Sequence, residues 1–488
     1  MVTLLDSQKK LFDILDDYFL ESYEEMKKEK WSSIEAANKM LRKYDSIVID
    51  SIYQTIYEEL YYDFWEKNYN SIADNCKQSG GLKVFFNGGV PLQLEEFINK
   101  SLLYVDTILI SDAFSLLYNS RFEGIPQLRS DVRYSGYRLF QYSLTLLKLK
   151  DIILSNNKIP PIAIVPSVIS IYSKEYRTKV KQLIEDDEID FATDIFGTKI
   201  SSTQEIANLL NTYKTPTELI SHIKKVEYFK CPLEKLDEPI DLLNHYFEIM
   251  LDNLGHDYNC NIREHPVIKQ IVYELFLFGQ LELIIPNQLN CDKLGANPIM
   301  EEYTDMQYYL WKIKKDNLTI FNNIKKDIDP DVLISNILHI EDFKWLGNIP
   351  LKSILKIRDD GGLQDIRDIF KREISHVNNV NENDFLEIIE QVKYNLKQAF
   401  IKHEKEVEKI DKQYRKQQFY NTSGVVMGVF SCAAGLFPPL NLLSVAGGLV
   451  GTKSIFDIIH DWYEKKEIDK ELLSRPVGIL FEAQKKAS

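Results

Sequence analysis

Three histidines and one cysteine lie close together in the middle of the chain, and these are residue types that bind zinc. They are His245, His256, Cys260 and His265, in a chain that holds eight histidines in all. Zinc sites usually draw their imidazole and thiolate ligands from closely spaced pairs. The spacings of 11, 4 and 5 residues match no such pattern. We therefore expect no metal, with His256, Cys260 and His265 as weak candidates.

Two aspartates flank a short apolar run, residues 107–110, that is typical of a strand. Open α/β sheets bind ligands beyond the carboxyl ends of their strands. Asp112 stands at that end and could hold a metal or a ribose hydroxyl, so one hypothesis is an α/β enzyme that uses Asp106 or Asp112. The simpler interpretation is that Asp112 accepts hydrogen bonds from the first N–H groups of the next helix.

Other chemistry is poorly supported by the residue pattern. Asn87-Gly88-Gly89 is too short for a phosphate-binding loop and lacks its lysine and hydroxyl residue. No serine, cysteine or histidine stands beside a base in the way nucleophilic catalysis requires. The catalytic residues stay unassigned, no cofactor is expected, and we favour a protein that is not an enzyme.

The elements around these residues indicate a mainly α protein with a small α/β unit near residues 83–170. Strand-like runs occur at 83–86, 107–110, 151–154 and 162–166, and helical patterns separate them. A length of 488 residues suggests about three domains. We predict a multi-domain helical protein with four regions: a helical region 1–78, the α/β unit with a helical extension 79–235, a helical domain 236–348, and a region 349–488.

Two long helices are predicted in the second half of the chain. The sequence VIKQIVYELFLFGQLELII, residues 267–285, is apolar nearly all round and is expected to be buried on most sides. Residues 383–421 carry apolar side chains three and four apart, close to a heptad seam. That seam predicts packing within the domain or, alternatively, contact with a protein partner or self-association through the 383–421 helix.

An apolar, glycine-rich hairpin follows the second helix. It spans 424–451, is split by Pro438-Pro439, and carries the small-residue pairs Gly424/Gly428 and Gly447/Gly451. Each half is about 21 Å long as a helix, shorter than a hydrocarbon core of about 30 Å. Small residues four apart let helices approach closely in a core or in a membrane. Both interpretations stay open, with a buried core preferred to membrane contact at these glycines and prolines.

Composition narrows the possible functions. A formal net charge of -14 opposes binding to nucleic acid, which depends on phosphate neutralisation. Five scattered cysteines without a CxxC pair indicate a reduced compartment, so a cytoplasmic location is expected, and the abundance of Lys, Ile and Asn suggests a bacterial origin. The leading hypothesis is an intracellular helical protein that binds a macromolecule or acts as a scaffold in a bacterial defence or stress system. The alternative is a membrane-acting effector that inserts the hairpin.

Overall fold

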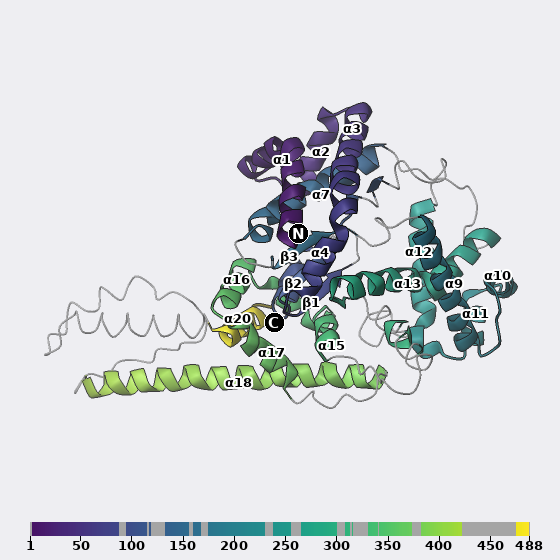
Figure 1. Ribbon diagram of the computed structural model, residues 1–488. Coiled ribbons are helices and arrows are strands. Elements are labelled where there is room, and N and C mark those ends of the chain that lie inside the picture. Colours follow the sequence, from purple (N-terminus) through teal and green to yellow (C-terminus); the bar gives the residue numbers. More distant parts are fainter. Residues whose placement is uncertain are drawn as a thin grey trace. The chain divides into compact units, whose positions relative to one another are not determined.

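The computed structural model describes most of the chain and is dominated by helices (Figure 1). The described residues are 2–86, 94–114, 117–118, 132–155, 160–166, 174–229, 238–254, 265–299, 308–312, 315, 330–339, 341–372, 382–421 and 475–487. Within these ranges the strands form one small parallel sheet. The predicted fold class, mainly α with a small α/β unit, is confirmed.

The chain divides into two compact units. The first combines Met1–Pro350 with Glu373–Ile389, and the second combines Leu351–Arg372 with Glu390–Ser488. The first unit holds the sheet and the three sites considered below. The predicted division into four regions stays a prediction.

A run of five helical segments begins the first unit. They are α1 (Leu4–Glu29), α2 (Ser33–Lys43), α3 (Ser46–Tyr57), the π-helix η1 (Glu58–Trp65) and α4 (Glu66–Gln78). The Ser32 hydroxyl accepts from the Glu35 N–H at 3.2 Å while the Glu35 carboxylate accepts from the Ser32 N–H at 2.8 Å. This reciprocal capping box fixes where α2 begins.

The sheet has four parallel strands in the order β3-β2-β1-β4. They are β1 (Lys83–Phe86), β2 (Thr107–Ser111), β3 (Ile162–Val165) and β4 (Asn297–Pro298). Every residue of the first three strands is buried, as expected for a parallel sheet covered on both faces. Helices α5 (Leu94–Leu102) and α7 (Val132–Ile153) lie between the strands in the chain and also pack against them.

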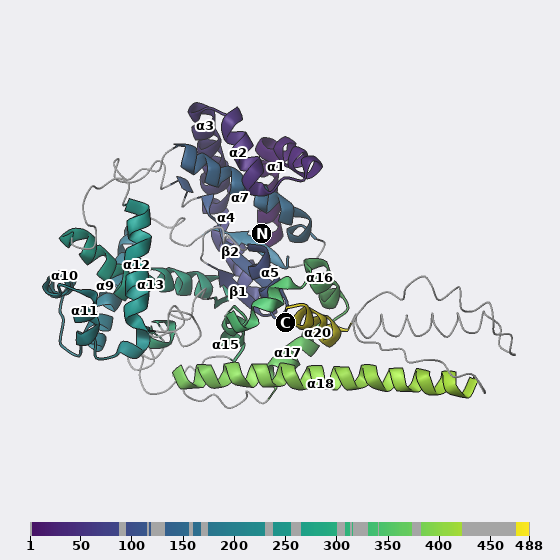
Figure 2. The same cartoon turned by 180° about the vertical axis from the view of Figure 1, so that it is seen from behind.

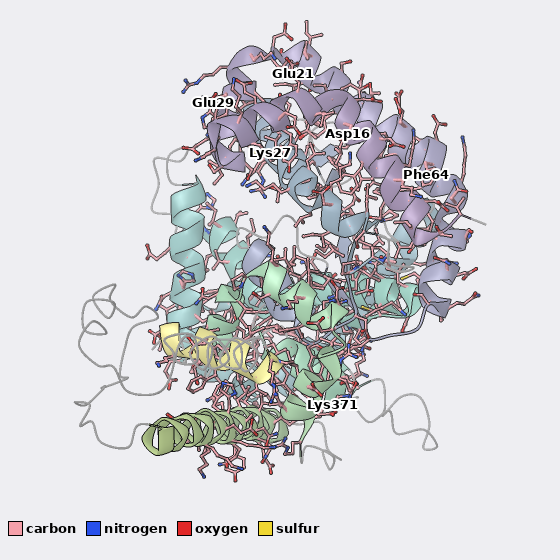
Figure 3. All side chains as sticks on the ribbon, turned by 90° about the vertical axis from the view of Figure 1, so that its left-hand side faces the viewer. Asp16, Glu21, Lys27, Glu29, Phe64 and Lys371 are labelled. Carbon is pink, nitrogen blue, oxygen red and sulfur yellow. The ribbon has the colours of Figure 1, made fainter. Side chains whose placement is uncertain are left out.

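The strand expected at residues 151–154 is wrong. Residues 151–153 form the last turn of α7, and Ile153 is fully buried there. A run of four residues rich in apolar side chains looks the same at the end of a buried helix as in a buried strand. One turn of α7 is tied to α1 by a half-buried ion pair between Lys150 and Asp16, and Asp16 is labelled in Figure 3.

A helical segment connects β3 to β4. It contains α9 (Lys174–Phe196), α10 (Thr203–Thr212), α11 (Pro216–His222), α12 (Pro239–Leu254) and α13 (Pro266–Leu294). Helix α13 packs against α9, α10 and α12, and these helices lie side by side in both views (Figures 1 and 2). It also contacts α4, β1 and β4, so one helix joins this bundle to the sheet.

The second unit contains α16 (Leu351–Asp359), α17 (Leu363–Lys371), α20 (Pro476–Ala487) and the later part of α18 (Glu382–Asn421). Helix α17 packs against α20, and Phe400 of α18 contacts Phe481 of α20. Gly361 follows α16 with φ +77°, a left-handed conformation that glycine adopts readily at the end of a helix. The long helix predicted at 383–421 is confirmed as α18. The seam residues whose side chains the structure describes are buried, and they are Ile389, Val392, Leu396, Ala399 and His403.

The described helices include none that is both long and apolar enough to cross a membrane. The hairpin 424–451, with Gly424, Gly428, Pro438, Pro439, Gly447 and Gly451, lies outside the described residues. The choice between its two interpretations therefore stays a prediction.

Candidate functional site

Asp112 lies at the carboxyl end of β2, where ligands of open α/β sheets bind, and its carboxylate is already engaged. The side chain is 4% exposed. The Tyr61 hydroxyl donates to Oδ2, and the Phe114 N–H donates to Oδ1 at 2.7 Å. The second contact is the acceptor role predicted for Asp112 toward the following backbone. Among the described residues, this carboxylate therefore holds the local structure through hydrogen bonds to its own chain.

Tyr142 adds a second buried hydroxyl beside Asp112. Its Oη accepts from the Ala113 N–H at 3.3 Å. Burial raises the pKa of Tyr142 far above its ordinary value, and the charge of Asp112 raises it further. Tyr142 therefore stays neutral at physiological pH, and its buried hydroxyl is not a base at this edge of the sheet.

Asp106 lies at the opposite end of β2 from Asp112. Its Oδ2 accepts from the Leu82 N–H at 2.6 Å, which ties the entry of β1 to the entry of β2. Six residues of extended chain separate the two aspartates, about 20 Å at the usual rise of a strand. The two carboxylates therefore do not share a site, and the hypothesis of an enzyme that uses Asp106 or Asp112 stays a prediction.

The π-helix η1 is an unusual feature near Asp112. Tyr57 stacks on Tyr118 with ring centroids 3.8 Å apart and on Tyr61 at 4.7 Å. The Trp65 indole N–H donates to the Ser7 hydroxyl at 2.9 Å. Although π-segments are frequent at functional sites, the wider turn here directs two aromatic side chains to buried partners. Tyr57 and Tyr61 are both buried, so these tyrosines belong to a packed helix face.

A serine–histidine pair lies elsewhere in the first unit and could not be found from the sequence, because its members are 238 positions apart. Ser101 Oγ lies 3.0 Å from His339 Nε2, and the imidazole stacks on Phe97 at 4.7 Å between centroids. His339 stands between α15 (Pro330–Ile337) and η5 (Glu341–Asn348). Nucleophile and base are therefore within hydrogen-bonding reach of each other.

The surroundings of this pair do not suit nucleophilic catalysis. Ser101 is 2% exposed and lies in the last turn of α5, where its carbonyl accepts from the Tyr104 and Val105 N–H groups at 2.9 Å. The carbonyl end of a helix carries partial negative charge and disfavours an oxyanion, which needs N–H donors. We interpret the pair as a packing contact.

Acid is expected to destabilise the protein through His339. Burial, with a smaller effect of the Lys100 charge, lowers the pKa of His339 to about 3. The pKa of this histidine in the unfolded chain is about 6.5, so between pH 6.5 and pH 3 the unfolded chain binds a proton that the folded chain does not. The free energy of unfolding therefore falls as pH drops below about 6.5, by about 2 kcal/mol at pH 5. Urea unfolding of the parent and His339→Gln at pH 7 and pH 5 tests this. Identical pH slopes in the two proteins would contradict it.

The predicted metal candidates are only partly within the described residues. His256 and Cys260 lie outside them. His265 precedes α13, and its Nδ1 is buried with no hydrogen-bond partner in the described part of the chain. No cluster of three or more metal-ligating side chains occurs among those same residues. The expectation of no metal stays a prediction.

A groove of about 400 Å³ lies between α9, α10 and α13, and we call it the α9–α13 groove. Apolar side chains from all three helices line it. These are Ile184, Ile206, Ile271, Leu275 and Phe278. Gly279 lies in the same wall and leaves space where another residue would place a side chain. The groove thus offers an apolar surface that the described residues do not fill.

Helix α13 is buried on most sides, as expected, but one stripe beside the groove is exposed. Val267, Ile271 and Leu275 are 59%, 38% and 39% exposed. They are four residues apart and therefore lie on one face of the helix. Apolar residues on all sides of a helix indicate that several of its faces can be buried. They do not show whether another element of the same chain packs against each face.

The polar side chains that line the groove are mainly acidic. Glu185 and Glu188 come from α9 and Glu274 from α13, against a single lysine, Lys181. Lys181 lies 3.7 Å from Glu185 and is largely exposed, so solvent screens the pair. The lining therefore carries a net formal charge of -2 around its apolar surface.

Asp187 of α9 belongs to the same acidic run but is buried away from solvent. Lys312 Nζ lies 3.0 Å from one carboxylate oxygen and Lys315 Nζ 2.5 Å from the other. Lys315 also pairs with Asp190 at 2.6 Å. This cluster anchors α9 and so supports one wall of the groove. The run 185–190 lies in the interior of α9 and includes both buried and groove-lining residues.

Gly279→Ala is expected to raise the free energy of unfolding by about 0.5–1 kcal/mol, because alanine restricts the unfolded chain and favours the helix. The added Cβ would lie 3.7 Å from Leu275, an ordinary contact. At Gly136 of α7, a Cβ would lie 3.0–3.1 Å from side-chain atoms of Ile49 and Leu41, so Gly136→Ala should gain less or destabilise. Urea unfolding of both variants tests the order, and the reverse order would contradict it.

Comparison with known proteins gives no family for this chain. No family model, curated protein or solved structure matches it. Functional conclusions therefore depend on the side chains themselves.

Proposed function

We propose that this chain is a binding or scaffold protein that holds a partner protein in the α9–α13 groove, and that it is not an enzyme. The observation that carries the proposal is the exposed apolar stripe Val267, Ile271 and Leu275, which continues into the groove lining. Contiguous exposed apolar surface on a protein marks an interaction site more often than scattered single side chains do.

Burial energetics support a protein partner at this place. Each square ångström of apolar surface removed from water contributes about 25 cal/mol, so covering three large aliphatic side chains together is favourable. Ile271 and Leu275 both form part of the stripe and part of the groove lining. A partner that covers the stripe would therefore fill the groove as well.

The other candidate sites among the described residues give weaker support for a function than the groove does. Asp112 accepts two hydrogen bonds from its own chain, and the Ser101–His339 pair lies at the carbonyl end of a helix. The seam of α18 is engaged within the chain near Phe481 of α20, which contacts Phe400 and His403. Self-association through residues 383–421 is therefore a weaker proposal than binding in the groove.

Site-specific photo-crosslinking tests the proposed function. A benzophenone amino acid replaces Val267 in one protein and Ile47 of α3, 77% exposed, in the control. Within cells that produce the chain, we expect an adduct from position 267 that is absent at position 47 and is lost when Gly279→Leu fills the groove. The captured protein should then bind the purified chain. The same adducts from both positions, unchanged by Gly279→Leu, would overturn the proposal.

A further inference from the structure

We infer that the α9–α13 groove binds a basic amphipathic helix of the partner protein. This rests on the proposed function and specifies the chemistry of the partner. Three properties of the groove lead to it: the sign of the charge around it, the kind of backbone that walls it, and the length of its apolar stripe.

The charge around the groove favours a cationic partner. Glu185, Glu188 and Glu274 line it against Lys181 alone. The nearby Asp187 does not add to this field, because two lysines neutralise it on the buried side of α9. Lysine or arginine side chains flanking an apolar stripe would place opposite charges beside these glutamates, whereas an acidic helix or a nucleic acid would be repelled.

The walls of the groove favour a helix over an extended peptide. An extended peptide leaves its own N–H and C=O groups unpaired unless a sheet edge pairs them. Here the lining residues belong to α9, α10 and α13, whose backbone groups are paired within the helices apart from the ends. A partner that enters an apolar groove of this kind has to satisfy its own backbone, and a helix does so.

The length of the stripe matches a helix of several turns. From Val267 to Gly279 the rise along α13 is about 18 Å, or just over three turns. A partner helix with apolar residues at positions i, i+4, i+7 and i+11 presents a stripe of about 17 Å, which is a similar length. Gly279, at the end of this stretch, adds no side chain and allows a large apolar residue of the partner to enter.

Fluorescence anisotropy with defined peptides tests the inference. The probes are two labelled peptides of about 18 residues, one of leucine and lysine and one of leucine and glutamate, each with a single leucine stripe. We expect the leucine–lysine peptide to bind the full chain with a Kd in the micromolar range, at least tenfold more tightly than its acidic counterpart. Its affinity should fall as salt is added, because salt screens the attraction.

Two sets of variants distinguish the effect of the charges that line the groove from the effect of the net charge of the protein. Glu185→Gln, Glu188→Gln and Glu274→Gln together should weaken binding of the leucine–lysine peptide by about tenfold. The matched control makes the same three changes at exposed positions of α1, namely Glu21, Glu25 and Glu29, two of which are labelled in Figure 3. The control should bind as the parent does. Equal weakening by both sets would overturn the inference, since it would show attraction to net charge alone.

Gly279→Leu distinguishes failure of this inference from failure of the proposed function, once a thermal melt shows that the variant folds. If both peptides bind equally and Gly279→Leu abolishes both, the groove docks helices without charge selection: the inference fails while the proposed function stands. If neither peptide binds at about 1 mM, or Gly279→Leu changes nothing, the groove is not a helix-docking site. Either result would overturn the inference. If Gly279→Leu changes nothing, that result also counts against the proposed function.

Discussion

Asp187→Ala is expected to lower the free energy of unfolding by about 3 kcal/mol. Removing one member of a buried ion pair leaves its partners charged and poorly solvated, which costs far more than losing a surface pair. Asp187 is 4% exposed and faces both Lys312 and Lys315. Equilibrium urea unfolding at pH 7 measures the change, and Asp186→Ala, at the exposed neighbouring position, should stay within about 0.5 kcal/mol of the parent.

The same cluster makes a prediction about alkaline pH. Burial alone lowers the pKa of Lys315, but its hydrogen bonds and attraction to Asp187 and Asp190 outweigh that effect, so the net pKa is raised. A raised pKa in the folded state stabilises the protein below the unfolded value of about 10.5, and this contribution is lost as pH rises above it. Asp187→Ala should therefore reduce the loss of stability above pH 10.

Equal losses of stability in Asp187→Ala and Asp186→Ala at pH 7 would contradict the proposed anchoring role.

Gln8→Met is expected to destabilise the first unit by about 3 kcal/mol, because it leaves two backbone groups of a strand without partners in a buried place. Gln8 is fully buried and its amide forms two hydrogen bonds of 2.8 Å with Ile164 of β3, one to the N–H and one to the carbonyl. Methionine keeps a similar volume, so the loss reports the hydrogen bonds more than a cavity. Urea unfolding measures it, with Lys9→Ala at an exposed neighbouring position as control.

Hydrogen exchange provides a second measurement for Gln8. In the parent, the Ile164 amide should exchange slowly, because its acceptor is a buried side chain. Gln8→Met should accelerate exchange at Ile164 more than at Leu109 of β2, in the interior of the sheet. A variant as stable as the parent, with Ile164 still protected, would show that another group can cover this edge.

The elements that could be predicted from sequence are those whose signal lies in contiguous residues. Strands β1, β2 and β3 appear as short apolar runs, and α18 as one long periodic segment. Strand β4 could not be predicted, because Asn297 and Pro298 carry no strand pattern and pair with β1 from more than 200 positions away. The partners of Asp187, His339 and Gln8 are likewise distant in the chain.

The groove could be predicted only in part. Its acidic residues are visible in the run 185–190, and the apolar character of α13 is visible in 267–285. What the sequence cannot show is which apolar face lacks a neighbour, because that depends on where α9 and α10 pack. The stripe Val267, Ile271 and Leu275 has the same residue types as the buried face.

The late position of β4 in the chain has a consequence during synthesis. Strands β3, β2 and β1 are complete once residue 165 has emerged, yet β1 obtains its second neighbour only with residues 297–298. At about 5–20 residues per second, ribosomes need roughly 7–26 s to make the intervening stretch of about 130 residues. During that interval the unpaired side of β1 can recruit other nascent chains, so the yield of native protein should depend on chaperones that shield this edge.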